Sequence, residues 1–87
     1  DYADHAASIL RETLDDVVGD AGDVTVHPQV LEGRPARVLT RVAGSADTLV
    51  VGSHGRGELP GMHLGSTAAY CVHHAPCPVV VLREAAA

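Results

Sequence analysis

Aromatic residues and lysine are scarce in this sequence of 87 residues. It contains no Trp or Phe and only two tyrosines, Tyr2 and Tyr70. Modules that stack RNA bases need exposed rings, so this scarcity argues against them. Lysine is absent, and six arginines stand against eleven Asp and Glu, which gives a formal net charge of −5. An acidic chain gains no overall counterion release on DNA or RNA, so no nucleic-acid partner is expected.

Long apolar runs are also missing. The longest, residues 79–82, is far short of the ~20 residues that a membrane span requires. Residues 1–20 are acidic and amphipathic, which fits neither a secretory signal nor an Arg-rich transit peptide. We therefore expect a cytoplasmic protein without a membrane partner.

The cysteines are too few and too far apart for a redox or metal motif. Cys71 and Cys77 are separated by five residues and do not form a C-x-x-C pair, so buried free thiols are expected. Adding His73 and His74 does not give a zinc site, because on a helix only Cys71 and His74 share a face. Two converging ligands fall short of the four of a structural zinc site. No metal site is expected.

The spacing of apolar residues predicts helices alternating with strands. Helices are predicted over residues 2–18, 36–43 and 66–75. Strands are predicted over 48–51 and 79–82, and an edge strand over 24–31, interrupted by Pro28. Glycines and prolines mark a loop over 52–65, and residues 83–87 are a frayed tail.

This order predicts a single α/β domain over residues 1–87. Strands that alternate with helices imply right-handed crossovers and a parallel sheet, here in three layers. The continuous apolar run Thr48–Val51 is typical of a central strand buried on both faces.

The loop after that strand is the candidate binding site. It runs from a strand end into a helix start, where ligands of open α/β sheets bind and where free N–H groups favour an anion. Its glycines allow close backbone approach. Ser66 and Thr67 are expected to cap the helix and to offer hydroxyls, and Arg56 adds a charged donor. A plain loop with a capping Ser66 is the alternative, because the loop contains neither a Walker A nor a Rossmann fingerprint.

The spacing Gly52-x2-Gly55-x9-Gly65-Ser66 is similar to the G-2x-G-9x-G-[ST] motif of the ATP-binding branch of the universal stress protein family. The flanking stretches 47–57 and 74–81 resemble that family's strand-and-loop signature and its closing helix-to-strand passage. Residues 33–36 resemble the entry to the preceding helix. The resemblance covers residues 24–83 well and the first helix loosely.

The resemblance implies a Rossmann-like sheet that binds ATP or a related adenine nucleotide, with Mg²⁺ where a triphosphate is bound. It implies a regulatory module of the stress response without dedicated catalysis. It also implies a homodimer through the last strand, Val79, Val80, Val81 and Leu82. By motif match the phosphate contacts are Gly52, Gly55, Gly65 and Ser66, with Ser53, Arg56, Gly57 and Thr67 close by.

One departure from the family pattern affects the adenine contacts. Complete members begin with a strand, a helix and a second strand that supply most adenine and ribose contacts, and these are absent here. We therefore expect that the 87 residues are not the whole native domain.

Two other functions remain open: a slow ATPase or phosphotransfer protein using Ser66, Thr67 or His54, and a dimeric scaffold that binds no nucleotide. His54 and His63 are further candidates for contact with a phosphate or a divalent ion.

Overall fold

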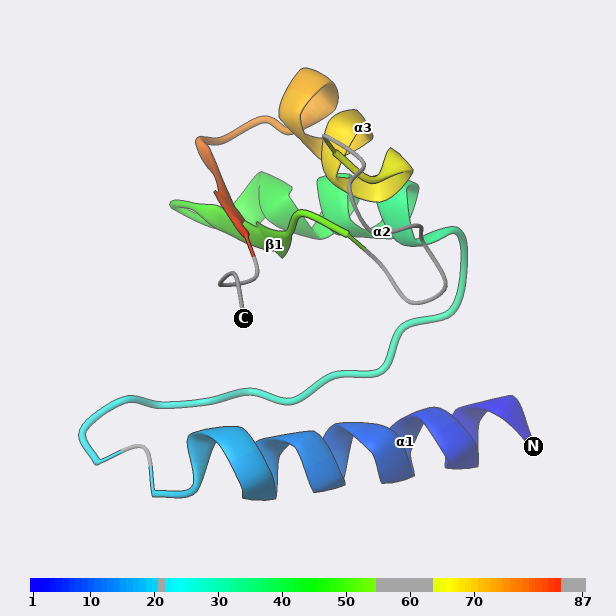
Figure 1. The fold of residues 1–87 in the computed structure, drawn as a ribbon, viewed down its shortest axis with the longest axis vertical. Coiled ribbons are helices and arrows are strands. Elements are labelled where there is room, and N and C mark those ends of the chain that lie inside the picture. Colours follow the sequence, from blue (N-terminus) through cyan, green and yellow to red (C-terminus); the bar gives the residue numbers. More distant parts are fainter. Residues whose placement is uncertain (21, 55–63, 84–87) are drawn as a thin grey trace. The chain divides into compact units, whose positions relative to one another are not determined.

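The computed structural model describes residues 1–20, 22–54 and 64–83 (Figure 1). The chain forms two compact units, residues 1–32 and 33–87. Within the described residues, no helix combines the length and the apolar character needed to cross a membrane.

The N-terminal unit is built on one helix. α1 spans Tyr2–Thr13 and continues into the π-helical turn η1, Leu14–Val18. The Asp1 carboxylate caps the start by accepting hydrogen bonds from two first-turn N–H groups, at 2.7 and 3.1 Å. Gly19 follows with a φ of 55°, which glycine adopts without steric cost. The helix predicted over 2–18 is confirmed, although its last five residues are π-helical.

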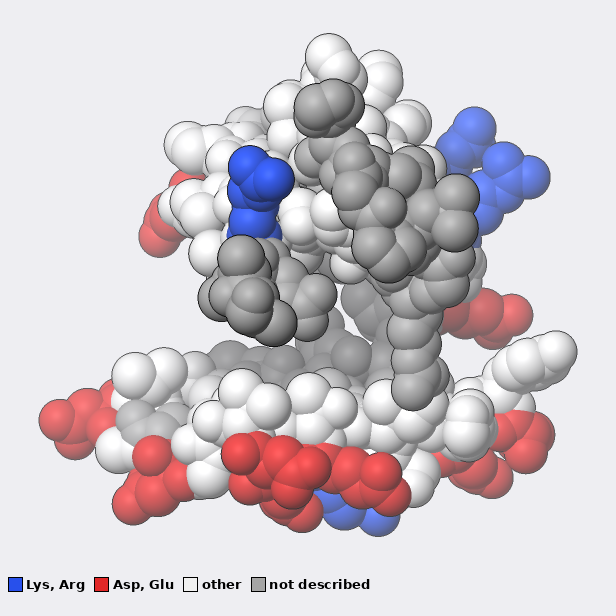
Figure 2. Space-filling view, in the orientation of Figure 1, with Lys and Arg blue, Asp and Glu red and all other residues white. Residues whose placement is uncertain are grey.

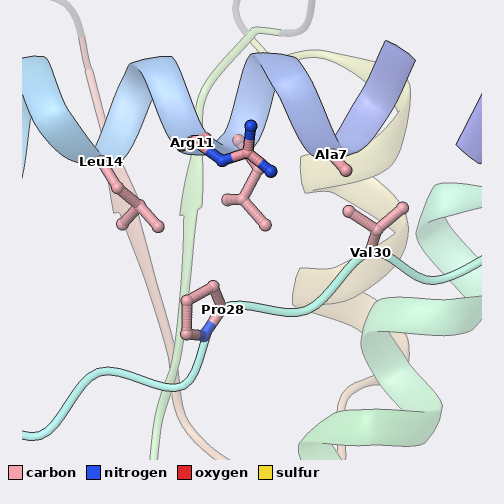
Figure 3. A pocket seen from close by; sticks show the side chains of 6 residues that line it. Ala7, Arg11, Leu14, Pro28 and Val30 are labelled. Atoms are coloured by element: carbon pink, nitrogen blue, oxygen red, sulfur yellow. The ribbon is translucent and has the colours of Figure 1, made fainter. Parts of the chain in front are cut away.

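Residues 24–32 are extended but form no strand, so the edge strand predicted over 24–31 is wrong. A strand exists only by pairing with a neighbour, and the two strands of the described chain pair only with each other. Pro28 in addition lacks a backbone N–H. Side chains of this segment instead line a hollow together with side chains of α1 and η1 (Figure 3); its walls are Ala7, Leu10, Arg11, Leu14, Pro28 and Val30.

The C-terminal unit contains the remaining elements, and all of them except an unpredicted 3-10 turn lie within two residues of their predicted bounds. They are α2 (Pro35–Val42), the 3-10 turn η2 (Ala43–Ser45), β1 (Leu49–Gly52), α3 (Ser66–His74) and β2 (Val79–Leu82).

Before α2, the turn at Gly33 accepts only glycine. Its φ is 131°, and an added Cβ would lie 2.8 Å from Cγ2 of Val38, the buried residue of α2.

β1 and β2 pair in parallel, as predicted, in a register that runs from Leu49 opposite Val79 to Gly52 opposite Leu82. α3 connects the two strands, as a parallel crossover requires. The α/β class and the parallel sheet are therefore confirmed.

The core of this unit lies on one face of the sheet. Its buried centre consists of Val51 from β1 and Ala68 and Cys71 from α3. α2 and α3 pack against each other (Figure 1) and both contribute to this core. The half-buried apolar residues around it are Leu39, Leu49, Leu64, Val79 and Val81.

The opposite face of the sheet is open. Val50 is 55% exposed, Val80 45% and Leu82 58%. Within this unit the described residues bury β1 on one face only, whereas the sequence predicted burial on both faces. Side chains alternate between the faces of a strand, and both helices of this unit cover the face of Val51. The described residues of this unit thus form two layers, a sheet and the helices on one of its faces.

This one-sided core can be tested with two neighbouring valines of β1. Val51→Ala removes two buried methyl groups and leaves a cavity, so we expect it to lower the free energy of unfolding by about 2 kcal/mol. Val50→Ala on the open face should change it by less than about 0.5 kcal/mol. Urea denaturation of both variants gives the comparison. Equal losses would show that something covers the Val50 face as well.

Candidate functional site

The carboxyl ends of β1 and β2 meet at one edge of the sheet and border an open hollow of about 330 Å³. In open α/β sheets ligands bind beyond this edge. The residues that line the hollow are Gly52, Ser53, His54, Leu82 and Arg83.

Ser53 joins three elements at this edge. Its N–H donates to the Leu82 carbonyl at 2.8 Å, which extends the pairing of β1 with β2 by one residue. Its carbonyl accepts a hydrogen bond from the N–H of Gly65 at 2.6 Å, which attaches the start of α3. The Ser53 side chain is 4% exposed, and its Oγ lies 3.1 Å from Nδ1 of His54. The end of β1 is therefore held to both β2 and α3.

Among the described residues no side chain caps the N-terminus of α3, whereas Asp1 caps α1. Gly65 occupies the N-cap position, and Ser66 is the first helical residue, so the prediction that Ser66 and Thr67 cap this helix is wrong. The N–H groups of a first helical turn have no partner within the helix, and the helix dipole makes this end positive. Ser66 is exposed and Thr67 is half-buried. The start of α3 can therefore receive an anion.

The structure brings the described site residues of the sequence motif together. Gly52 and Ser53 line the hollow, and the hydrogen bond from Gly65 to Ser53 holds Ser66 and Thr67 close to it. Because the Gly65 N–H is used in this bond, it is not available to a ligand. The remaining residues named from the motif or the loop lie outside the described residues: Gly55, Arg56, Gly57 and His63.

Sequence reasoning missed Arg83, which it assigned to a frayed tail. The structure places Arg83 in the wall of the hollow, directly after β2. The signal that could have found it is the parallel pairing of two four-residue strands, since residues that follow parallel neighbours meet at one edge.

Charge is divided unevenly between the two units. Residues 1–32 contain one arginine and eight carboxylates, and Figure 2 shows acidic side chains gathered along α1. Residues 33–87 contain five arginines and three carboxylates. The hollow thus belongs to the unit with the positive excess, which favours an anionic ligand.

Both cysteines are free thiols; Cys71, on α3, is fully buried, and Cys77 is half-buried. Burial raises the pKa of the Cys71 thiol above its ordinary value of 9.0, because an apolar surrounding disfavours the thiolate. Among the described residues, no three His, Cys, Asp or Glu side chains come together as metal ligands.

A parallel α/β unit with a glycine at the strand end and an uncapped helix start is a Rossmann-like domain suited to anions. Residues 2–83 match the universal stress protein family, and the chain therefore belongs to that family. Membership places it among proteins of the stress response.

Two similar proteins come from Mycobacterium tuberculosis strain H37Rv. Universal stress protein Rv1996 is 51% identical over 61 residues, which cover 70% of this chain and 19% of the relative. Universal stress protein Rv2005c is 50% identical over 62 residues, 71% of this chain and 21% of the relative.

A more distant relative extends the similarity over nearly the whole chain. Universal stress protein MT2698 of Mycobacterium tuberculosis strain CDC 1551 is 30% identical over 84 residues, 97% of this chain and 28% of the relative. The aligned part of this chain thus spans 19% to 28% of the length of these relatives. No solved structure is a significant match.

The buried thiol leads to a prediction about alkaline pH. The folded state holds the Cys71 pKa above 9.0 because burial favours the protonated thiol. The stability that this protonated thiol contributes is complete below about pH 9 and is lost as the pH rises through the pKa of the folded state. We expect the free energy of unfolding to fall above about pH 9 and Cys71→Ala to flatten this fall. Urea denaturation across the alkaline range measures it. Cys77→Ala is the control and should keep the slope; an unchanged slope in Cys71→Ala would contradict the prediction.

Proposed function

We propose that this edge of the sheet binds the phosphates of an adenine nucleotide, ATP or a close relative. The observation that carries the proposal is the backbone link from Ser53 to Gly65, which holds the uncapped start of α3 against the ends of two parallel strands. A polyanion at this position gains hydrogen bonds from free N–H groups and the favourable end of the helix dipole.

Four described residues would contact or border the phosphates. Gly52 has no Cβ and leaves the backbone accessible. Ser66 and Thr67 offer hydroxyl and first-turn N–H donors, and buried Ser53 fixes the wall behind them. The glycine motif extends the proposed contacts to Gly55, Arg56 and Gly57, outside the described residues.

The choice of an adenine nucleotide is supported by the likeness of the glycine spacing to the ATP-binding branch of the family. Mg²⁺, where it accompanies a triphosphate, would be held by phosphate oxygens and water, because it keeps several waters in such sites. We propose a regulatory module of the cytoplasm that senses the nucleotide without dedicated catalysis.

A pair of glycine variants tests the phosphate site. Gly52→Ala adds a methyl group at the hollow, and the nearest atom to it would be the His54 carbonyl oxygen at 3.6 Å, an ordinary contact. The fold should therefore tolerate it, while the affinity for Mg-ATP falls about tenfold because the added Cβ hinders close approach of phosphate. Isothermal titration calorimetry measures the affinity, and thermal melting checks the fold.

Gly44→Ala is the matched control, because an added Cβ there meets nothing within 4 Å and Gly44 does not line the hollow. It should bind Mg-ATP as the wild type does. Unchanged affinity in Gly52→Ala, or an equal loss in Gly44→Ala, would count against the site.

We also propose a homodimer through β2, formed by Val79, Val80, Val81 and Leu82. In the described chain β2 pairs with β1 alone, so the backbone groups of its other edge have no strand partner. Such an edge readily pairs with another strand, and the exposed Val80 and Leu82 add apolar surface beside it.

Lysine substitutions at two similarly exposed valines distinguish a charge on the β2 edge from a charge placed elsewhere on the surface. Val80 on β2 is 45% exposed and Val72 on α3 is 48% exposed. We expect Val80→Lys to convert a dimer into a monomer, because a charge on an edge strand opposes strand pairing. Val72→Lys should remain dimeric. Native mass spectrometry measures the state; a monomeric wild type, or a dimeric Val80→Lys, would refute the proposed interface.

A further inference from the structure

The hydroxyl of Ser53 is a buried polar group in the wall of the hollow. Ser53 is 4% exposed and lines the hollow together with half-buried His54. Its Oγ lies 3.1 Å from Nδ1 of the His54 ring, and within the described part of the chain this nitrogen is the only hydrogen-bond partner of the hydroxyl. A buried polar group without a partner costs free energy, so this one contact determines where the hydroxyl proton lies.

The direction of this hydrogen bond follows from what each atom can donate. A hydroxyl has one proton to donate, whereas one nitrogen of a neutral imidazole is a donor and the other an acceptor. If Nδ1 carried the ring proton and donated it to Oγ, the proton of the buried Ser53 hydroxyl would have no acceptor among the described residues. If the hydroxyl donates to Nδ1, its proton is satisfied and the ring proton lies on Nε2. The second arrangement leaves no buried donor unpaired and is therefore favoured.

This tautomer decides what the His54 ring can bind. Histidine binds a metal ion through a neutral nitrogen, and here Nδ1 accepts from Ser53 while Nε2 carries the ring proton. The ring therefore has no lone pair left for a divalent ion. The Nε2–H group is a hydrogen-bond donor, which a phosphate oxygen accepts, and protonation of the ring leaves this group unchanged. Of the two ligands considered for His54, the phosphate fits and the divalent ion does not.

We propose that Ser53 is a positioning residue, whose hydroxyl holds His54 as the Nε2–H tautomer so that His54 donates a hydrogen bond to a phosphate in the hollow. This inference rests on the proposed nucleotide function and deepens it, because it gives Ser53 and His54 separate parts at the site.

The tautomer can be measured in the intact protein by two-bond proton–nitrogen correlation NMR of the imidazole rings, at about pH 8.5, where histidines are ordinarily neutral. We expect an unprotonated Nδ1 and a protonated Nε2 in His54, whose signals are assigned by their loss in His54→Phe. In Ser53→Ala the two nitrogen signals should move toward each other, because the Nδ1–H tautomer is then populated as well. Ser45→Ala is the matched control, since the Ser45 hydroxyl also bonds a residue close in sequence but does not line the hollow. It should leave the spectrum of His54 unchanged.

Titration calorimetry with Mg-ATP tests the contact with phosphate. Ser53→Ala and His54→Phe should each bind about fivefold more weakly than the wild type, the effect of one lost hydrogen bond, whereas Ser45→Ala should bind normally. Because Ser53 acts through His54, the double variant should bind no more weakly than His54→Phe alone. A further loss in the double variant would show that Ser53 acts independently of His54. Thermal melting checks the fold of each variant.

The outcomes separate this inference from the proposed function. A protonated Nδ1 in the wild type, or an unchanged His54 spectrum in Ser53→Ala, would overturn the role of Ser53; the wild-type spectrum decides the tautomer even where a variant fails to fold. If His54→Phe binds Mg-ATP as tightly as the wild type, the contact of His54 is overturned and the nucleotide function stands. If the wild type binds no nucleotide, the proposed function fails, and inorganic tripolyphosphate becomes the probe. Weaker binding of this anion to His54→Phe would keep His54 as an anion donor, and equal or absent binding would exclude it.

Discussion

The backbone of Ser53 holds the functional edge of this chain together. Its N–H bonds to Leu82 at the end of β2, and its carbonyl accepts the N–H of Gly65 at the start of α3. Both groups are buried with their residue, so leaving either unpaired would cost free energy. The constraint explains why the two strand ends and the helix start meet at one place. An anion site made of backbone donors depends on this meeting, because the donors come from separate parts of the chain.

Small side chains in α3 allow this arrangement. Ala68 and Cys71 are the positions at which α3 contacts the sheet, and both are buried against Val51. Their size lets the helix lie close to β1, which brings its first turn to the strand end. Charge is a second factor, because the unit of residues 33–87 contains more arginines than carboxylates and so favours an anionic ligand. Packing thus sets the position of the helix start, and charge sets the kind of ligand that it favours.

The function proposed for this member of the universal stress protein family follows from two levels of evidence. The family match covers residues 2–83, and the geometry supplies an uncapped helix start, an open glycine and a neighbouring arginine. The chain aligns with 19% to 28% of the length of these relatives.

The sequence by itself determined the elements that depend on local periodicity and breakers: the helices, the two short apolar strands and the glycine loop between strand and helix. It also pointed to Gly52 and Ser53, which follow the predicted strand and line the hollow at its end. Tertiary structure alone decided the rest. Residues 24–31 have strand-like alternation but pair with neither of the two described strands, Val50 is apolar but no described helix of its own unit packs on its face, and Arg83 is brought to the hollow by the sheet register. Pairing and burial are relations between distant segments, and a local pattern does not contain them.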